Sequence, residues 1–181
     1  MTGTRPSPFP SRRALIAAPG VVLAAPALAQ RANWPTQPVR FIGIFPPGGA
    51  TDVLARIWCA RMAEITNQQF VTENRSGSGG NVGTEAIARA NPDGATIGLA
   101  SVASLAVAPT LYRRLPFDAA RDFSLICGLW QLPNLLVVHP SVEARTVPEL
   151  IDLCRRNPGR YTFASSGAGT TVHLSGEMFK H

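Results

Sequence analysis

The junction at residues 39–66, where an apolar run passes through a glycine turn into a helix pattern, is the stretch most suited to ligand chemistry. The apolar run ends at Pro46-Pro47, Gly48-Gly49 follow, and apolar residues then recur at helical spacing from Leu54 to Ile65. The first amides of a helix have no partner within it, and the helix dipole places partial positive charge there, so such a junction favours a carboxylate or phosphate. We interpret it as an anion site; a tight turn without a ligand is the alternative.

The residues after Gly49 exclude two common nucleotide-binding motifs. A Walker A loop needs Lys followed by Ser or Thr, but Ala50-Thr51-Asp52 stand here. The dinucleotide fingerprint G-x-G-x-x-G does not fit the adjacent glycines Gly48-Gly49. The prediction is therefore a backbone-amide site for a small anion.

The elements around this junction predict a parallel sheet flanked by helices. Strands are expected at residues 39–45, 70–73 and 96–101, and helices at residues 50–66 and 82–90. Alternating strands and helices are typical of a parallel sheet, and its ligands gather at the carboxyl ends of the strands.

Three loops should meet at that edge of the sheet: residues 46–52, 74–81 and 101–104. All three are rich in Gly, Ser and Pro. Arg75 is their single cation, and it could pair with a ligand carboxylate or, as we favour, with the neighbouring Glu73. Asn81 stands where a helix cap is expected.

The second part of the chain starts another sheet. Strands are expected at residues 124–130, 135–139 and 161–164, and helices from Thr146, with Glu149 completing a capping box, and over residues 172–181. The loop at residues 165–171 repeats the opening pattern of strand, Gly/Ser loop and helix. No later element follows to cover this sheet, so the chain is expected to be a fragment or a truncated reading frame.

The residues that could support catalysis do not form a recognised pattern. Ser165, Ser166 and His173 could serve a hydrolase, but no serine lies in a G-x-S-x-G elbow, and the chain is predicted not to be an enzyme. The three histidines have no metal-ligand spacing, so neither metal nor cofactor is expected. Cys59, Cys127 and Cys154 show no C-x-x-C pair; small core residues are favoured over a disulfide bridge.

Residues 1–29 have the features of an export signal. Three arginines precede an apolar run that ends in the small-x-small site Ala27-Leu28-Ala29, with cleavage expected after about Ala29. Arg12-Arg13 also fit a twin-arginine signal, so the export route stays open. Cleavage would remove three of the 17 basic residues and none of the 11 acidic ones. The remaining charge is small and scattered, which does not favour nucleic acid as a partner.

Several motifs, in this order, resemble the Bug (TctC-like) family of substrate-binding proteins of tripartite tricarboxylate transporters. They are FPPGGATD at residues 45–52, ENRSGSGGNVG at 73–83, PDG at 92–94, LYRRLPFD at 111–118, Pro133-Asn134, and ASSGAGT at 164–170 with His173. The resemblance implies an α/β, periplasmic-binding-protein-like (Venus flytrap) fold of two lobes with parallel-rich sheets flanked by helices. It also implies a periplasmic monomer that captures a small organic carboxylate, such as a di- or tricarboxylate, and delivers it to membrane permease subunits.

On this basis residues 1–29 are expected to be the signal, 30–106 the first lobe, 107–139 a connecting or hinge segment, and 140–181 the start of an incomplete second lobe. The predicted ligand-binding set, from the loop positions and the resemblance together, is Pro47, Gly48, Gly49, Ala50, Thr51, Asp52, Gly79, Gly80, Asn81, Ser101, Ser104, Ser165, Ser166, Gly167, Gly169, Thr170 and His173. A periplasmic serine hydrolase and a nonfunctional remnant are the alternatives.

Overall fold

The computed structural model of the protein describes residues 34–181, and the predicted export signal lies outside them. In chain order the first elements are β1 (Val39–Gly43), α1 (Ala50–Thr66), β2 (Phe70–Asn74), a short 3-10 turn η1 (Ser78–Gly80), α2 (Asn81–Ala88) and β3 (Thr96–Gly98). This is the predicted alternation of strands and helices. The strand predicted at residues 96–101 is shorter than expected.

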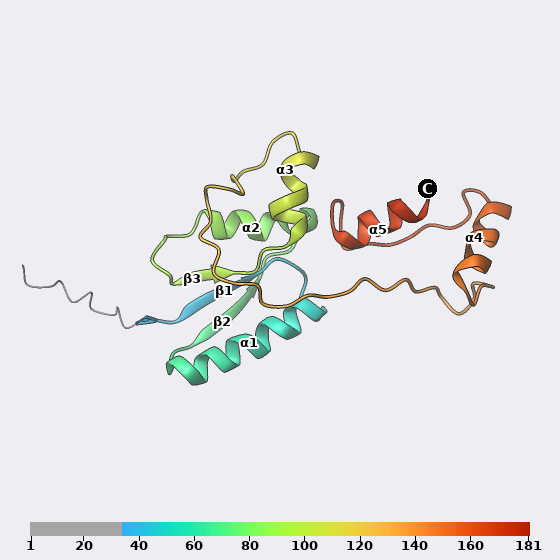
Figure 1. The fold of residues 1–181 in the computed structure, drawn as a ribbon. Helices are drawn as coiled ribbons and strands as arrows, with labels where there is room; N and C mark the ends of the chain where they lie inside the picture. The colour runs from blue at the N-terminus through green and yellow to red at the C-terminus, as the bar shows by residue number, and fades with distance from the viewer. Residues whose placement is uncertain (1–33) are drawn as a thin grey trace, which may run out of the picture. The chain divides into compact units, whose positions relative to one another are not determined.

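The three strands form one parallel sheet in the order β2-β1-β3 (Figure 1). β1 is central, with Val39 opposite Phe70 and Arg40 opposite Thr96. Because all strands are parallel, their carboxyl ends lie at one edge of the sheet, where the following loops begin. The predicted parallel sheet flanked by helices is confirmed.

The central strand is apolar because both of its faces are covered. Phe41 packs with Ala55 and Cys59 of α1, and the Trp58 ring lies against the Phe41 ring at a centroid distance of 5.2 Å, tilted by 44°. Ile42 and Ile44 are fully buried. Successive side chains of a strand point to opposite faces, so Ile42 and Ile44 face away from α1, toward the side of the sheet on which Figure 1 shows α2.

Two glycines let the head of α2 approach the end of β1 very closely. A Cβ atom at Gly83 would lie 2.6 Å from the Arg75 carbonyl oxygen and 2.9 Å from the Ile44 Cα. A Cβ atom at Gly80 would lie 2.9 Å from the Ile44 Cδ1. A side chain at Gly83 would therefore push the head of α2 away from β1, because two of these atoms are backbone. At Gly80 the positive φ of 103° is the stronger requirement for glycine, because the tip of the Ile44 side chain can move.

The remaining helices follow the sheet in sequence. A π-helical segment η2 (Ala103–Val107) runs into α3 (Ala108–Leu111), and α4 (Val147–Arg156) and α5 (Thr171–Phe179) come later. The helices at residues 103–111 were not predicted. α4 begins as expected, with Thr146 Oγ1 accepting from the Glu149 amide at 3.4 Å, and the Glu149 carboxylate accepts from the Arg145 amide at 2.6 Å.

The prediction of strands at residues 124–130, 135–139 and 161–164 is wrong. These residues are in neither strand nor helix, and residues 131–141 are all exposed. A strand needs a neighbouring strand for its amides and carbonyls, and within residues 34–181 none pairs with these segments. Their apolar residues therefore remain without a sheet.

The three cysteines are free: Cys59 is buried, Cys154 is partly buried, and Cys127 is exposed. Cys59 is thus a core residue as predicted, but Cys127 is not. In the described part of the chain no helix has the length and apolar character needed to cross a bilayer.

Replacing Phe41 with Ala should lower the free energy of unfolding by about 3–5 kcal/mol, because a fully buried aromatic side chain is lost from the centre of the sheet. Urea unfolding followed by Trp fluorescence measures the change. As a control, Ile57→Ala on the exposed side of α1 should change it by less than about 0.5 kcal/mol. Equal effects of the two substitutions would contradict this core assignment.

Candidate functional site

The head of α1 presents amides to the edge of the sheet. The Asp52 and Val53 amides both donate to the Gly49 carbonyl oxygen at 3.0 Å. Within residues 34–181 the amides of Gly49, Ala50 and Thr51 have no acceptor at hydrogen-bond distance. Gly49 is the N-cap residue of α1, and having no side chain it cannot accept a hydrogen bond from the first amides of the helix. These three N–H groups can therefore donate to an anion.

Asp52 fixes the loop that carries these amides. Its buried carboxylate accepts from the Gly48 amide at 2.9 Å, from Arg56 Nε at 3.0 Å and from Asn74 Nδ2 at 3.0 Å. Asn74 also donates to the Phe45 carbonyl oxygen at 3.1 Å. The network joins the end of β1, the end of β2 and the first turn of α1. Asp52 and the Gly48 amide, both in the predicted site, are thus engaged within the loop.

These contacts hold Asp52 in its charged form. The hydrogen bond from Arg56, then those from the Gly48 amide and Asn74, lower the pKa of Asp52 from 3.8 to about 2. The carboxylate and the half-exposed Arg56 guanidinium form an ion pair at 3.0 Å, which offsets their charges beside the loop.

The glycine loop after β2 folds into a compact turn beside this junction. Gly77, Gly79 and Gly80 have positive φ angles of 140°, 65° and 103°, which glycine adopts without strain. The Gly80 amide donates to the Gly77 carbonyl oxygen at 2.9 Å. Gly80, and not Asn81 as the sequence suggested, caps α2.

Asn81 is the first residue of α2 and is 93 % buried, with a relative exposure of 7 %. Its side-chain oxygen is the one buried side-chain polar atom without a hydrogen-bond partner in the described region. A buried amide without a partner costs about 1–3 kcal/mol, so such groups are usually satisfied by a ligand or an ordered water. Sequence reasoning placed Asn81 in the site but gave no sign that its side chain lacks a partner.

Ser101 and Ser104 bond each other. The Ser101 amide donates to Ser104 Oγ at 3.3 Å, and the Ser104 amide donates to Ser101 Oγ at 3.4 Å. Ser104 is fully buried. The pair therefore fixes the start of η2, and Ser101 alone is partly accessible.

The loop before α5 is fixed by its own side chains. Buried Thr170 caps α5 by accepting from the His173 amide at 3.2 Å, and it donates to the Gly167 carbonyl oxygen at 2.7 Å. His173 Nδ1 accepts from the Gly169 amide at 3.5 Å, and Ser165 Oγ accepts from the Gly167 amide at 3.4 Å. His173 makes no hydrogen bond to Ser165 or Ser166, so the pairing that a hydrolase requires is not formed.

The glycine loop and the Ser-Ser-Gly loop touch. A Cβ atom at Gly79 would lie 2.7 Å from the Ala168 carbonyl oxygen, and one at Gly167 would lie 3.1 Å from the Gly79 Cα. A Cβ atom at Gly169 would lie 2.8 Å from Leu111 of α3. Loops that are far apart in sequence, at residues 77–81 and 165–170, thus meet through glycines.

Glu73 pairs with one arginine at this edge and with another from the amino end of β1. Arg75 Nε donates to Glu73 Oε1 at 2.6 Å, the role favoured from the sequence, and Arg40 bonds the other oxygen of the same carboxylate at 2.7 Å. These two hydrogen bonds lower the pKa of Glu73. Residues 34–181 contain no group of three acidic, His or Cys side chains arranged for a metal ion. Besides the paired arginine, the donors at this edge are backbone amides and hydroxyl groups.

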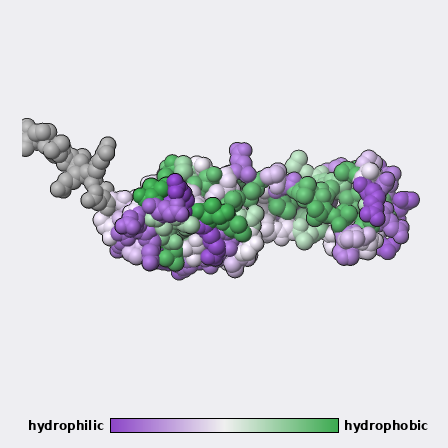
Figure 2. Space-filling model, turned by 90° about the horizontal axis from the view of Figure 1, so that it is seen from below, coloured by the Kyte–Doolittle hydropathy of each residue, from purple (hydrophilic) through white to green (hydrophobic). Residues whose placement is uncertain are grey.

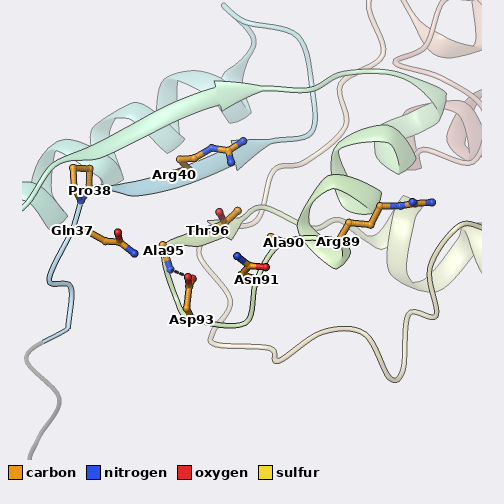
Figure 3. Close-up of a pocket in the computed structure, with 9 residues that line it drawn as sticks. All are labelled: Gln37, Pro38, Arg40, Arg89, Ala90, Asn91, Asp93, Ala95 and Thr96. Atoms are coloured by element: carbon orange, nitrogen blue, oxygen red, sulfur yellow. Dashed lines mark hydrogen bonds between the residues drawn. The ribbon is translucent and has the colours of Figure 1, made fainter.

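A shallow pocket at the opposite edge of the sheet does not match this chemistry. It is lined at the amino ends of β1 and β3 by Gln37, Arg40, Asn91, Asp93 and Thr96, among others (Figure 3). Its two arginines are paired, Arg40 with Glu73 and Arg89 with Glu85 at 2.7 Å each. No helix begins there to provide free amides, so we place the candidate site at the carboxyl edge.

Replacing Asp52 with Asn should lower the thermal stability by several degrees at pH 7, because the charged form is the one stabilised in the fold. The folded pKa of about 2 lies below the ordinary 3.8, so this contribution is complete above pH 3.8 and is lost as the pH falls toward 2. The difference in Tm between wild type and Asp52→Asn should shrink over that range. A difference that does not change with pH would contradict the network.

The chain is similar to several curated bacterial proteins. It is 39 % identical over 171 residues to a UPF0065 protein from the tcbD-tcbE intergenic region of Pseudomonas sp. strain P51, a match that covers 92 % of this chain and 50 % of the relative. It is 34 % identical over 170 residues to the protein BugT of Bordetella pertussis, covering 92 % and 52 % of the two chains. The chain thus spans about half the length of the curated relatives it matches.

Solved structures agree with the sequence matches. The protein described as R. palustris Rpa4515 with adipate is 37 % identical and has a TM-score of 0.78, with 81 % of this chain and 49 % of the other covered. The periplasmic binding protein BugD is 30 % identical with a TM-score of 0.68, and the match covers 80 % and 48 % of the two chains. The family described as "Tripartite tricarboxylate transporter family receptor" (TctC) matches residues 54–181, so the chain belongs to the TctC family, as its motifs predicted.

Proposed function

We propose that this chain forms part of an extracytoplasmic solute-binding protein that captures a small organic carboxylate. The observation that carries the proposal is the set of unbonded amides at Gly49, Ala50 and Thr51, at the carboxyl edge of a parallel sheet. Peptide N–H groups at a helix start bind carboxylate oxygens well, and the helix dipole adds to the attraction. The similar Rpa4515 structure is described as holding adipate, a dicarboxylate.

The second group of donors comes from the loops that touch at Gly79 and Ala168. Ser165, Ser166 and the amide of Gly79 lie in these loops, and buried Asn81 adds an unpartnered amide oxygen beside them. That oxygen is an acceptor, so it would bind an ordered water or a hydroxyl group of the ligand rather than its charge. A dicarboxylate could then be held at one end by the head of α1 and at the other by the glycine loops.

The same geometry supports binding without a reaction. His173 is held by the Gly169 amide, and its Nε2 lies 3.7 Å from Glu177, so it is not placed as a base for either serine. A fluorophosphonate probe should leave Ser165 and Ser166 unlabelled. Labelling that disappears in His173→Ala would favour the hydrolase alternative.

The other features of the proposal follow from the family. The protein would reside in the periplasm after cleavage near Ala29, and it would deliver its ligand to membrane permease subunits. The first lobe at residues 30–106, the connecting segment at 107–139 and the second lobe from residue 140 remain predictions, as does a monomeric state.

A proline at position 50 tests the amide site directly. Ala50 is the first residue of α1, and Gly49 before it has the extended backbone, φ −76° and ψ 166°, that a following proline requires. Ala50→Pro therefore removes one N–H donor without breaking a helix hydrogen bond. A hydrogen bond to a charged group contributes about 1.5–3 kcal/mol, so adipate affinity in calorimetry should fall about 10- to 100-fold.

Ala50→Ser is the matched control, because it changes the side chain and keeps the amide. It should bind adipate within about 3-fold of the wild type. Unchanged affinity in Ala50→Pro, with an unchanged Tm, would exclude the head of α1 as the site. Failure of the wild-type chain to bind any of acetate, malate, adipate or citrate would count against the proposed function itself.

A further inference from the structure

We propose that a hollow beside the LYRRLPFD motif is a second binding site, for a small anion with an apolar body such as a short-chain monocarboxylate. The hollow has a volume of about 570 Å³ and is lined by residues of η2 and α3 and by the loop at residues 112–120. It shares no residue with the candidate site at the head of α1, so the proposal does not depend on the proposed function. Its lining includes Leu105, Pro109, Tyr112, Arg113, Leu115 and Phe117.

One wall of the hollow is built from a π-helical segment. Leu105 lies in η2, and Pro109 lies in α3, which follows directly. In the same two helices Ala103, Ser104 and Ala108 are buried, which fixes this wall against the rest of the fold. π-helical turns are rare and are frequently found at functional sites. The wall is therefore both fixed and of a geometry that is unusual in a purely structural helix.

The loop that forms the other wall is fixed by its own contacts. Phe117 is buried, and its ring lies edge-on to the Phe123 ring at a centroid distance of 5.7 Å. Asp118 Oδ1 accepts from the Ala120 amide at 2.9 Å, and Asp122 Oδ2 accepts from the Asp118 amide at 2.7 Å. The hollow is thus formed before a ligand binds, and binding does not have to order the loop.

Arg113 supplies the charge of the hollow. It is exposed, and within residues 34–181 neither Arg113 nor its neighbour Arg114 takes part in an ion pair. Asp118 also lines the hollow, but its two carboxylate oxygens face the Ala120 amide and the Arg121 guanidinium. The charge without a partner is therefore positive, which attracts an anion and disfavours a cation.

Most of the remaining lining is apolar, which selects the body of the ligand. Leu105, Pro109, Leu115 and Phe117 provide apolar surface, and Tyr112 adds a ring and a hydroxyl group. Small-molecule sites typically have volumes of about 300–1,000 Å³ and combine an apolar lining with a few polar groups. A ligand with one anionic head and an apolar chain fits this lining. A tricarboxylate does not, because its other charges would lie against apolar walls without partners.

Exposed apolar residues alone do not mark a site in this chain, because they are common on its surface. Figure 2 shows apolar areas beside hydrophilic ones on the face that it draws. Leu125 and Leu135, for example, are 77 % and 84 % exposed. The hollow at residues 105–120 is more specific than such areas, because two fixed walls form it and an arginine without an ion-pair partner lines it.

Titration of ¹⁵N-labelled protein with hexanoate, hexanol and hexylammonium tests this site. Hexanoate should shift the amides of residues 105–120, and it should bind there at least about 10-fold more tightly than hexylammonium and about 3-fold more tightly than hexanol, because only its head group pairs with Arg113. Arg113→Gln should weaken hexanoate binding about 3- to 10-fold and leave adipate binding unchanged. Arg114→Gln is the matched control: it removes the same charge one residue away, outside the lining, and should change hexanoate affinity less than about 2-fold.

Filling the hollow provides a second test. Ala106 lines it and is exposed, so Ala106→Trp should abolish the hexanoate shifts without disturbing the core. Ala60→Trp, at an exposed position of α1, should leave them unchanged.

The proposal is overturned if hexylammonium binds as tightly as hexanoate, if Arg114→Gln weakens binding as much as Arg113→Gln, or if hexanoate shifts only amides outside residues 105–120. Hexanoate shifts at residues 105–120 in a protein that does not bind adipate would support this site and contradict the proposed function.

Discussion

The structure at the candidate site depends on one buried carboxylate, Asp52. By accepting hydrogen bonds from the Gly48 amide, Arg56 and Asn74, it joins the ends of two strands to the first turn of α1. The turn is therefore fixed before a ligand binds, and the amides of Gly49, Ala50 and Thr51 remain without an acceptor. Binding to a fixed donor set does not have to order the loop, which favours affinity. The same carboxylate forms an ion pair with Arg56, which offsets the positive charge of that side chain beside the open amides.

A second constraint is the close approach of backbones. Glycines at positions 80 and 83 let the head of α2 rest on Ile44, and Gly79 touches the loop around Ala168. Side chains at these positions would separate the elements that carry the donors. The glycine motifs that carried the family resemblance in the sequence are thus explained by packing: they let the loops at the carboxyl edge of the sheet approach one another, while the amides of Gly48 and Gly80 are bonded within their own loops.

Much of the first half could be predicted from the sequence because its signals are local. The apolar run of β1 and the helical period of α1 correctly predicted both elements, and Arg75 pairs with Glu73 as favoured. The links from Asp52 to Asn74 and from Gly79 to Ala168 join residues distant in sequence and leave no local pattern. The helices at residues 103–111 were missed because they are short and Pro109 interrupts their pattern. The strands at residues 124–139 were predicted from apolar runs, but pairing depends on partners that the runs cannot show.

The central claim is that peptide amides at the carboxyl edge of the sheet hold a carboxylate. A titration of ¹⁵N-labelled protein with adipate, followed by amide chemical shifts, tests it most directly. The account predicts that the largest shifts fall on Gly49, Ala50, Thr51 and Gly79, with further shifts at residues 165–170. Shifts centred on Arg40, Asn91 and Thr96, at the opposite edge of the sheet, would contradict it.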